Sequence, residues 1–276
     1  MSGANASPAG RSHQAMSGAN ASPAGRSHQA MSGANASLAG RSHQAMTEVT
    51  VVKIGGALLE KPEAAAEQIV AQGGTGLVVV HGGGVQITRM LERMSVKSQF
   101  IDGLRVTDEV TLAAVAAALM GEVHTALIRA LQAAGIPAVG VFGAVKAEQK
   151  SGPWGLVGTN VRADRTVLDS IIDAGKVPVI PTLAVGPSSL LNVNGDETAA
   201  GVALALRATK LVFLTDVEGV LDADGALIER VPPEVSLLDA PFVTGGMKPK
   251  LRAVAAALAG GVTGVCVGRT VFGGTR

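Results

Sequence analysis

Two apolar runs in this chain each end in a cluster of glycines and are each followed by a segment of helical composition. Residues 49–54 are rich in β-branched side chains and end at Gly55-Gly56, while residues 77–80 are continuously apolar and end at His81-Gly82-Gly83-Gly84. A continuous apolar run is typical of a parallel strand buried on both faces, and residues 85–94 then predict a helix. Because ligands of such sheets bind where the strands end, the sequence predicts a binding site at the glycines.

The same alternation of strand-like and helix-like segments continues along the chain. Strand, helix and strand in this order require crossover connections, which predict an α/β fold with a mostly parallel central sheet and helices on both faces, a three-layer sandwich. We expect helices at 62–72, 108–131, 167–174, 196–207 and 248–259, further strands at 138–142, 177–180, 211–215 and 264–267, and a hairpin at 146–158.

The first 45 residues do not follow this alternation. The unit MSGANASPAGRSHQA fills residues 1–15, recurs at 16–30, and recurs at 31–45 with Leu38 in place of proline. Its small and polar residues cannot bury enough surface to offset the entropy of ordering, so we expect a disordered tail followed by one domain at 46–276. A mitochondrial-type presequence is an alternative, but the segment lacks an apolar stripe. A tandem duplication around the start codon, or a start assigned too far upstream of Met46, would account for the repeats.

Composition and charge exclude several classes of protein. The single cysteine leaves no disulfide framework and no cysteine-based zinc cluster. The apolar runs are interrupted by Gly, Pro or charge before the ~20 residues of a membrane helix, so we expect no membrane partner. The formal net charge is +1, and because the repeats carry three arginines and no acid, residues 46–276 have a net charge of −2. With only 2% aromatic residues, nucleic acid is not an expected partner either.

The glycine clusters alone leave alternatives open. Neither cluster fits GxGxxG or GxxxxGK[ST], so neither predicts a dinucleotide fold or a Walker-type loop. An isolated glycine pair is more often a tight turn than a ligand site. Two clusters together, with Lys53 directly before the first, favour a phosphate site, because the ammonium group of a strand lysine needs an anionic partner.

Six motifs in a fixed order carry a resemblance to a known family. VKIGG at 52–56 and VHGGG at 80–84 resemble the two glycine loops of the amino-acid kinase superfamily. Four further stretches are similar to motifs of the acetylglutamate kinases within it, and together the six span nearly all of the domain. These four are DGLRVTD at 102–108, NVNGD at 192–196, LTDVEGVL at 214–221 and TGGMKPK at 244–250.

The resemblance implies a catalytic site for phosphoryl transfer. Lys53 and Lys250 would contact the transferred group from opposite sides, and Asp196 would hold both ammonium groups in place. Asp196 could also be a helix N-cap, alone or together with that role, because an Ala-rich helix follows it. Lys248 is a second candidate for the role of Lys250, and Met247 favours Lys250 as the counterpart.

The acceptor and nucleotide sites follow from the same resemblance. Gly83, Gly84 and Asn194 would bind the acceptor, Asn192 its acetylamino group, and the planar guanidinium of Arg105 its α-carboxylate. Without the motif, Arg105 would be interpreted as a solvated charge on the rim. The implied cofactors are ATP and Mg²⁺, the metal being held mainly by the nucleotide phosphates. The implied nucleotide-binding residues are Gly55, Gly56, Thr215, Asp216, Val217, Gly219, Val220, Leu221, Phe242, Val243 and Thr244.

Four other residues stand out but are expected to be structural. His81 is not needed as a general base, because a carboxylate acceptor is already ionised at neutral pH. His124-Thr125 stands where acetylglutamate kinases often have Asn-Lys, and we expect the difference to affect helix packing. Cys266 is expected in the core, and Trp154 is expected to be a packing residue.

The implied function is ATP-dependent phosphorylation of the side-chain carboxylate of N-acetyl-L-glutamate to N-acetyl-L-glutamyl 5-phosphate, in arginine biosynthesis in the cytoplasm. The alternatives are a kinase for aminoadipate or glutamate linked to a carrier protein, and a catalytically silent regulatory module on the same fold. The family fold implies an acceptor lobe at about 46–190 and a nucleotide lobe at about 191–276. We expect a homodimer that arginine does not inhibit, because no helix pattern precedes the first motif, with its seam on the helix around residues 112–119.

Overall fold

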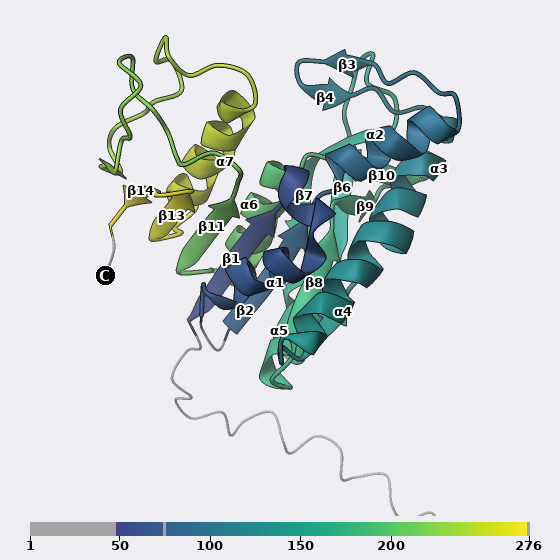
Figure 1. Cartoon of the computed structure of the whole chain (residues 1–276), viewed down its shortest axis with the longest axis horizontal. Helices are drawn as coiled ribbons and strands as arrows, with labels where there is room; N and C mark the ends of the chain where they lie inside the picture. The colour runs from purple at the N-terminus through teal and green to yellow at the C-terminus, as the bar shows by residue number, and fades with distance from the viewer. Residues whose placement is uncertain (1–47, 74–75, 275–276) are drawn as a thin grey trace, which may run out of the picture. The chain divides into compact units, whose positions relative to one another are not determined.

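An eight-stranded sheet forms the centre of the domain in a computed structural model that describes residues 48–73 and 76–274 (Figure 1). The repeats expected to be disordered, at 1–45, lie outside the described residues. Neighbouring strands are parallel except for β13 and β14, which confirms the predicted mostly parallel sheet. The strands, in order across the sheet, are β12 (Arg230–Val231), β14 (Thr270–Gly273), β13 (Gly264–Val267), β11 (Lys210–Leu214), β1 (Val49–Ile54), β2 (Gly76–His81), β8 (Val177–Pro181) and β5 (Ala138–Gly140).

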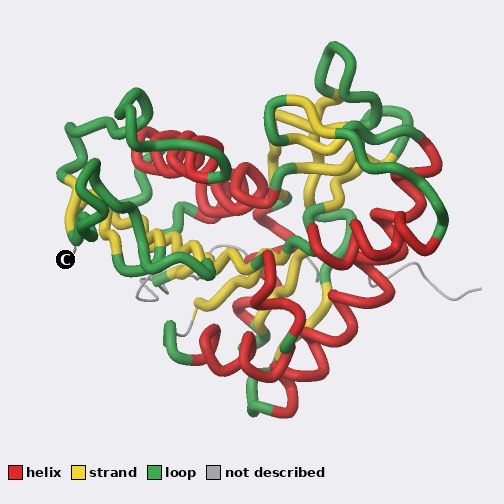
Figure 2. The backbone as a smooth tube through the Cα atoms, turned by 45° about the horizontal axis from the view of Figure 1, so that its top comes forward, coloured by secondary structure: helices red, strands yellow, loops and turns green. Residues whose placement is uncertain are grey.

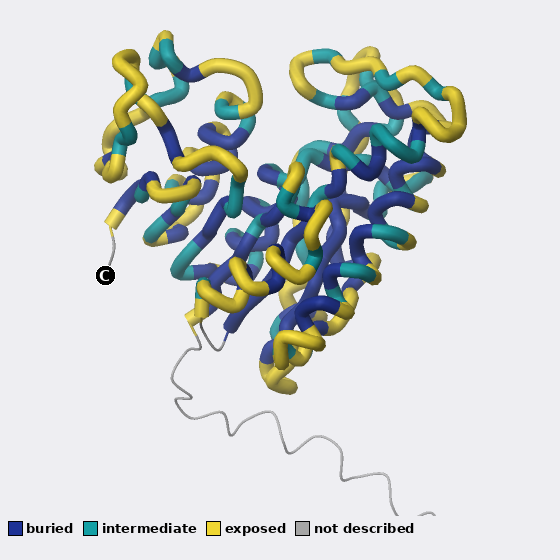
Figure 3. The backbone as a smooth tube through the Cα atoms, viewed as in Figure 1, coloured by how far each residue is buried: buried dark blue, intermediate teal, exposed yellow. Residues whose placement is uncertain are grey.

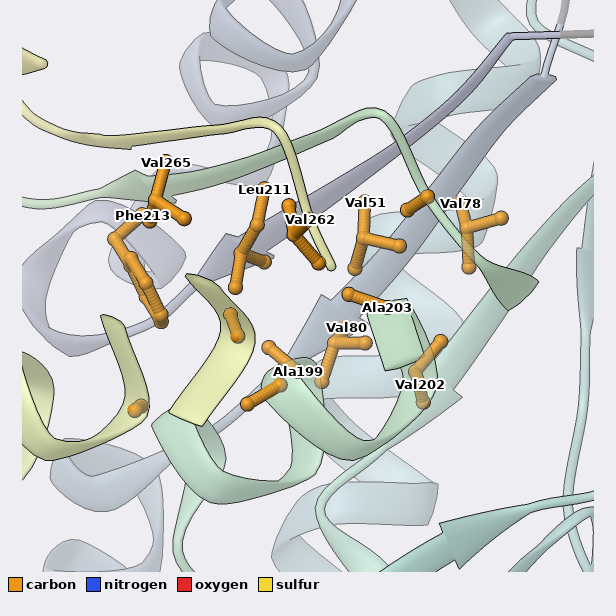
Figure 4. Packing of buried hydrophobic residues seen from close by; sticks show 14 of the residues in the cluster. Val51, Val78, Val80, Ala199, Val202, Ala203, Leu211, Phe213, Val262 and Val265 are labelled. Carbon is orange, nitrogen blue, oxygen red and sulfur yellow. The ribbon is translucent and has the colours of Figure 1, made fainter. Parts of the chain in front are cut away.

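Helices cover both faces of this sheet, because successive strand residues point to opposite sides. Val51 of β1 belongs to the core cluster on one face, whereas Val52 and Ile54 belong to the cluster on the other. The strands are buried between these layers (Figure 3), and Figure 4 shows Val51 beside Ala203. The helices are α5 (Arg165–Asp173), α6 (Gly195–Leu206) and α7 (Met247–Ala259) on the face of Val51, and α1 (Pro62–Val70) and α4 (Thr125–Ala133) on the face of Val52.

The helix predicted at 108–131 forms one long run with a π-helical section in its middle. It consists of α3 (Glu109–Ala116), the π-helix η2 (Ala117–His124) and α4. The side chain of Asp108 caps its start by accepting a hydrogen bond from the N–H of Thr111 at 2.7 Å. By length and composition this is the one helix within the described residues that could cross a membrane. Its Leu119 and Leu127, however, are fully buried against the chain's own elements.

The inward side of this helix is used within the domain. Leu112, Val115 and Leu119 belong to a core cluster shared with α2 (Gly84–Arg93). The leucines at the two ends of the predicted dimer seam are therefore unavailable for contact with a second copy. The exposed side of the same helix carries the smaller residues Ala113 and Ala117 instead.

A smaller sheet, mostly unpredicted, lies beside the central one (Figure 2). The antiparallel pair β6 (Val145–Gln149) and β7 (Val157–Ala163) confirms the predicted hairpin. β9 (Leu183–Val185) and β10 (Leu190–Val193) close these two strands into a four-stranded barrel. A short hairpin, β3 (Phe100–Ile101) and β4 (Leu104–Arg105), turns at Asp102 and Gly103, whose φ angles are 51° and 78°.

Candidate active site

Three charged side chains from distant parts of the sequence meet at the carboxyl end of β1. Lys53 is the next-to-last residue of β1, and its Nζ lies 2.9 Å from Oδ1 of Asp196. The Nζ of Lys250 lies 3.1 Å from Oδ2 of the same carboxylate. Asp196 and Lys250 stand in the first turns of α6 and α7, so two helices begin at this point. Lys248 is exposed, whereas Lys250 is buried and is the lysine of the two that contacts Asp196.

Asn194, and not Asp196, caps the start of α6. Its Oδ1 accepts hydrogen bonds from the N–H groups of Asp196 at 2.9 Å and Glu197 at 3.1 Å. The alternative interpretation of Asp196 as the N-cap is therefore wrong. Because Asn194 satisfies the backbone donors, the Asp196 carboxylate is left available for both lysines.

Burial and charge oppose each other in this cluster. Burial raises the pKa of the Asp196 carboxyl, but the ammonium groups of Lys53 and Lys250 together outweigh burial, so that the pKa lies below its ordinary value. Burial also lowers the pKa of Lys250, and the neighbouring Asp196 opposes that shift. Two ammonium groups against one carboxylate leave an excess of positive charge, so the cluster suits a further anion.

A cavity of about 270 Å³ opens beside Lys53, between the two glycine loops. Gly83 is closely packed, since a Cβ there would lie 2.8 Å from the Leu119 side chain. Gly56 has a φ of 63° where η1 (Gly56–Glu60) begins. Glycines in such positions let backbone N–H groups approach an anion closely. The lining comprises Lys53, Gly55, Gly56, Gly82, Gly83, Gly84, Ile87, Phe100, Gly103, Leu104, Arg105, Val157, Thr182, Asn192, Val193, Asn194 and Gly195.

Arg105 forms part of the cavity wall and is 8% exposed, so the interpretation as a solvated rim charge is wrong. Its guanidinium donates to Oγ of Ser98 and, at 2.8 Å, to Oγ1 of Thr88. It also donates to the carbonyl oxygen of Gly84 at 3.3 Å and lies 4.7 Å from the ring centroid of Phe100. Ser98, Thr88 and Phe100 were not predicted, because single Ser, Thr and Phe residues outside a motif carry no chemical signal.

Asn192 joins two of the motifs. Its Nδ2 donates to Oγ1 of Thr107 at 3.1 Å, and that hydroxyl donates to the carbonyl oxygen of Arg105 at 2.8 Å. Trp154 fixes the same region, because its carbonyl oxygen accepts from the N–H of Thr107 and its indole N–H donates to Ile101 at 3.2 Å. The β3–β4 hairpin is thus tied to the barrel at the edge of the cavity.

The residues expected to bind nucleotide are more spread out than those expected to bind the acceptor. Gly55 and Gly56 are the ones among them that line the cavity. The segment 215–221 follows β11, the neighbour of β1, so it too lies at the carboxyl end of the sheet. Val220 and Val243 are buried in the core, so they can meet a ligand through their backbone alone. Thr215 and Phe242 are half-buried, Gly219 is buried, and Asp216, Val217, Leu221 and Thr244 are exposed.

Two residues expected to be structural lie in the core or against it. His81 is fully buried, and its Nε2 lies 2.9 Å from Nδ1 of His124. Cys266 packs against the core cluster on the α1 and α4 face, and burial raises the pKa of its thiol. A thiol with a raised pKa stays protonated at neutral pH, which matches the prediction of an inert core residue.

The sequence matches the amino acid kinase family over residues 48–269. The chain belongs to the amino acid kinase family. Curated members similar to it include the acetylglutamate kinase of Rubrobacter xylanophilus, 41% identical over 231 residues that cover 82% of this chain and 89% of the relative. The acetylglutamate kinase of Methanopyrus kandleri is 40% identical over 228 residues, covering 76% and 91%.

Solved structures agree with membership of the amino acid kinase family. A protein from Streptococcus mutans UA159 superposes with a TM-score of 0.72 at 29% identity, covering 82% of this chain and 98% of that one. An N-acetylglutamate synthase from Neisseria gonorrhoeae, solved with coenzyme A and N-acetyl-glutamate, gives 0.73 at 26% identity and covers 84% and 61%. Giardia carbamate kinase, at 16% identity, a TM-score of 0.62 and coverage of 83% and 99%, shares the fold.

Proposed function

We propose that this amino acid kinase transfers the γ-phosphoryl group of ATP to the side-chain carboxylate of N-acetyl-L-glutamate, forming N-acetyl-L-glutamyl 5-phosphate and ADP. The observation that carries the proposal is the pairing of Lys53 and Lys250 with one carboxylate, that of Asp196, beside a glycine-lined cavity. The relatives from Rubrobacter and Methanopyrus, which this chain matches over most of their length, are named acetylglutamate kinase. The product belongs to arginine biosynthesis.

The chemistry asks the protein mainly to position two anions and to neutralise charge. An oxygen of the acceptor carboxylate attacks the γ-phosphorus, the bond to the β,γ-bridging oxygen breaks, and ADP leaves with the bonding pair. Lys53 and Lys250 would stabilise the charge on the transferred group, and Asp196 would hold both ammonium groups in place. No general base is required, because the acceptor is already ionised at neutral pH.

The acceptor would occupy the cavity between the glycine loops. Arg105 would bind its α-carboxylate with the guanidinium N–H donors that Ser98, Thr88 and Gly84 leave free, and Asn192 would contact its acetylamino group. The N–H groups of Gly83 and Gly84 would bind the reacting carboxylate and phosphoryl oxygens, since both glycines line the cavity. Asn194 would act mainly by capping α6, since its Oδ1 already accepts two backbone hydrogen bonds.

ATP would bind over the carboxyl ends of β1 and β11. Its phosphates suit the loop of Gly55 and Gly56, and its nucleoside would contact the segments 215–221 and 242–244. Within 48–73 and 76–274, no group of three or more His, Cys, Asp or Glu side chains could hold a metal ion. Mg²⁺ would be held mainly by the nucleotide phosphates and water, where it would neutralise phosphate charge.

The test is a coupled assay of ADP release with the purified chain. N-acetyl-L-glutamate, glutamate, aspartate and UMP are offered separately and in competition, and a carrier-linked glutamate or aminoadipate is offered as a further acceptor. We expect turnover with N-acetyl-L-glutamate far above the others. A preference for unacetylated glutamate, or turnover of the carrier-linked acceptor alone, would overturn the proposal. Absence of turnover with every acceptor would favour a silent regulatory module.

We further propose a cytoplasmic homodimer that arginine does not inhibit. In each subunit the acceptor lobe would comprise residues up to about 190 and the nucleotide lobe the residues from about 191 onward. The dimer contact would use the exposed side of the helix Glu109–Ala133, where Val110 is 50% exposed and Ala113 and Ala117 are exposed as well. Closed two-fold contacts through such apolar faces are the commonest form of oligomer.

A further inference from the structure

A chain of two buried histidines lies directly behind the second glycine loop. His81 is the last residue of β2 and is fully buried, and His124, the last residue of η2, is 6% exposed. Nδ1 of His81 lies 3.0 Å from the carbonyl oxygen of Gly82, and its Nε2 lies 2.9 Å from Nδ1 of His124. The catalytic roles proposed above use neither ring.

The contacts fix which nitrogens carry protons. A carbonyl oxygen can only accept, so Nδ1 of His81 must donate to Gly82. In a neutral ring the remaining nitrogen, Nε2, is an acceptor, and it therefore receives the Nδ1–H of His124. Burial lowers the pKa of His81 to about 3, which keeps its ring neutral at physiological pH. The hydrogen bonds thus run in one direction, from His124 through His81 to the Gly82 carbonyl.

Anchoring this carbonyl sets the direction of the next N–H group. In a planar trans peptide the C=O of Gly82 and the N–H of Gly83 point to opposite sides. His81 holds the oxygen on the side of its own ring, so the N–H of Gly83 is directed away from that ring. Gly83 lines the cavity, and no backbone or side-chain hydrogen bond of the described residues uses its N–H. This donor is therefore available to an anionic ligand.

The position of His124 is itself tightly constrained. A Cβ at Gly140, on the edge strand β5, would lie 2.4 Å from Nε2 of His124 and 2.8 Å from Cδ1 of Ile128. The φ angle of Gly140 is not positive, so alanine is compatible with the backbone there. A methyl group at this position would thus displace the His124 ring without changing either histidine.

We propose that His124 and His81 are positioning residues for phosphoryl transfer, holding the Gly82–Gly83 peptide so that the Gly83 N–H faces the reacting oxygens. The expected effect of these histidines on kcat rests on the proposed function. The hydrogen-bond chain itself is a property of the free protein.

The test uses His124→Asn, His124→Leu and Gly140→Ala in the full chain. Asn keeps an N–H donor bonded to Cγ, as in the imidazole, whereas Leu fills similar space without one. We expect His124→Leu and Gly140→Ala to lower kcat about tenfold, the order of one misplaced hydrogen bond in the transition state, with little change in the KM for ATP. His124→Asn should recover most of the kcat lost in His124→Leu. The exposed neighbour variant Thr125→Leu is the matched control and should behave as wild type.

A measurement without turnover separates this proposal from the proposed function. Imidazole ¹⁵N shifts at neutral pH should show both buried rings as neutral Nδ1–H tautomers, and the amide signal of Gly83 should move in His124→Leu and return in His124→Asn. Those shifts in a protein that does not phosphorylate N-acetyl-L-glutamate would overturn the proposed function and leave the histidine chain standing. An Nε2–H tautomer of His81, or equal damage by Asn and Leu with melting temperatures unchanged, would overturn the histidine chain.

Discussion

The Nζ of Lys250 lies 3.1 Å from Oδ2 of Asp196, a residue 54 positions earlier in the chain. The other oxygen, Oδ1, lies 2.9 Å from Nζ of Lys53 and also 3.2 Å from Nζ of Lys250, so both ammonium groups are held by one carboxylate. Without Asp196 the two cations would repel each other in a partly desolvated place. The carboxylate therefore keeps both ammonium groups close together, which is the arrangement that the proposed phosphoryl transfer requires.

Replacing either lysine should affect turnover more than binding. Lys53→Ala and Lys250→Ala each remove a charge that acts mainly on the transition state, so we expect kcat to fall by about 10²-fold or more with a smaller change in the KM of either substrate. Lys248→Ala is the matched control, because Lys248 lies on the same helical turn but is exposed. Steady-state kinetics of the three variants test this. If Lys248→Ala abolished kcat and Lys250→Ala did not, the role of the second lysine would belong to Lys248.

Asp196→Asn should destabilise the fold as well as the active site. The substitution leaves two ammonium groups without their carboxylate, and removing one partner from a buried ion pair costs about 3–5 kcal/mol. Urea denaturation should therefore show a lower free energy of unfolding. Adding Lys250→Met to Asp196→Asn should recover part of that loss, because the second unpaired cation is removed. A double variant whose loss equals the sum of the two single losses would show that the pair is not coupled.

The free energy of unfolding should fall as the pH is lowered from about 6.5 toward 5. Burial lowers the pKa of His81 from 6.5 to about 3, and burial also lowers the pKa of His124. In this pH interval each histidine binds a proton in the unfolded chain that its buried ring does not bind in the native protein. Acid therefore favours unfolding by up to about 1.4 kcal/mol per pH unit for each ring.

Urea midpoints measured across that interval test the prediction. His124→Asn serves as the comparison, because it removes one of the two titrating rings and should reduce the slope. The carboxyls with lowered pKa, such as that of Asp196, act below this interval and should not interfere. Stability that stays level or rises on acidification would show that the rings are protonated in the native state.

The central sheet could be predicted because its strands are buried on both faces. β1 and β2 are short apolar runs ending in glycine, and both lie where the sequence placed them. β9 and β10 have three and four residues, too few for a pattern to emerge, and their pairing depends on distant segments. The barrel beside the acceptor cavity was therefore missed.

The candidate site shows a similar division. Lys53, Asp196 and Lys250 were indicated by motifs, and the structure brings them together. The sequence could not decide which residue caps α6, because Asn194 and Asp196 are both good N-cap residues. Only the contacts of Asp196 with the two lysines show that its carboxylate is used elsewhere and that Asn194 is the cap. The burial of Arg105 likewise depends on partners that no local pattern reveals.

Arg105 should resist replacement by lysine. We expect Arg105→Ala to raise the KM for the acceptor strongly and to leave the KM for ATP nearly unchanged. Arg105→Lys should behave like alanine, because a single ammonium group cannot reach Thr88 and Gly84 while also presenting a flat edge to a carboxylate. Kinetics with the acceptor varied at saturating ATP test this. Full recovery by lysine would show that charge alone is recognised.

The proposed dimer contact can be tested by one surface charge. Ala117 lies on the exposed side of the helix Glu109–Ala133, so Ala117→Lys should leave the fold intact while placing two like charges at a two-fold contact. Light scattering should then report the monomer mass, whereas the matched control Ala256→Lys, on the exposed side of α7, should remain a dimer. Deleting residues 1–45 should change neither the mass nor the activity, with or without arginine. A hexamer that falls to a dimer on this deletion, or inhibition by arginine that the deletion abolishes, would instead assign the repeats a part in assembly and control.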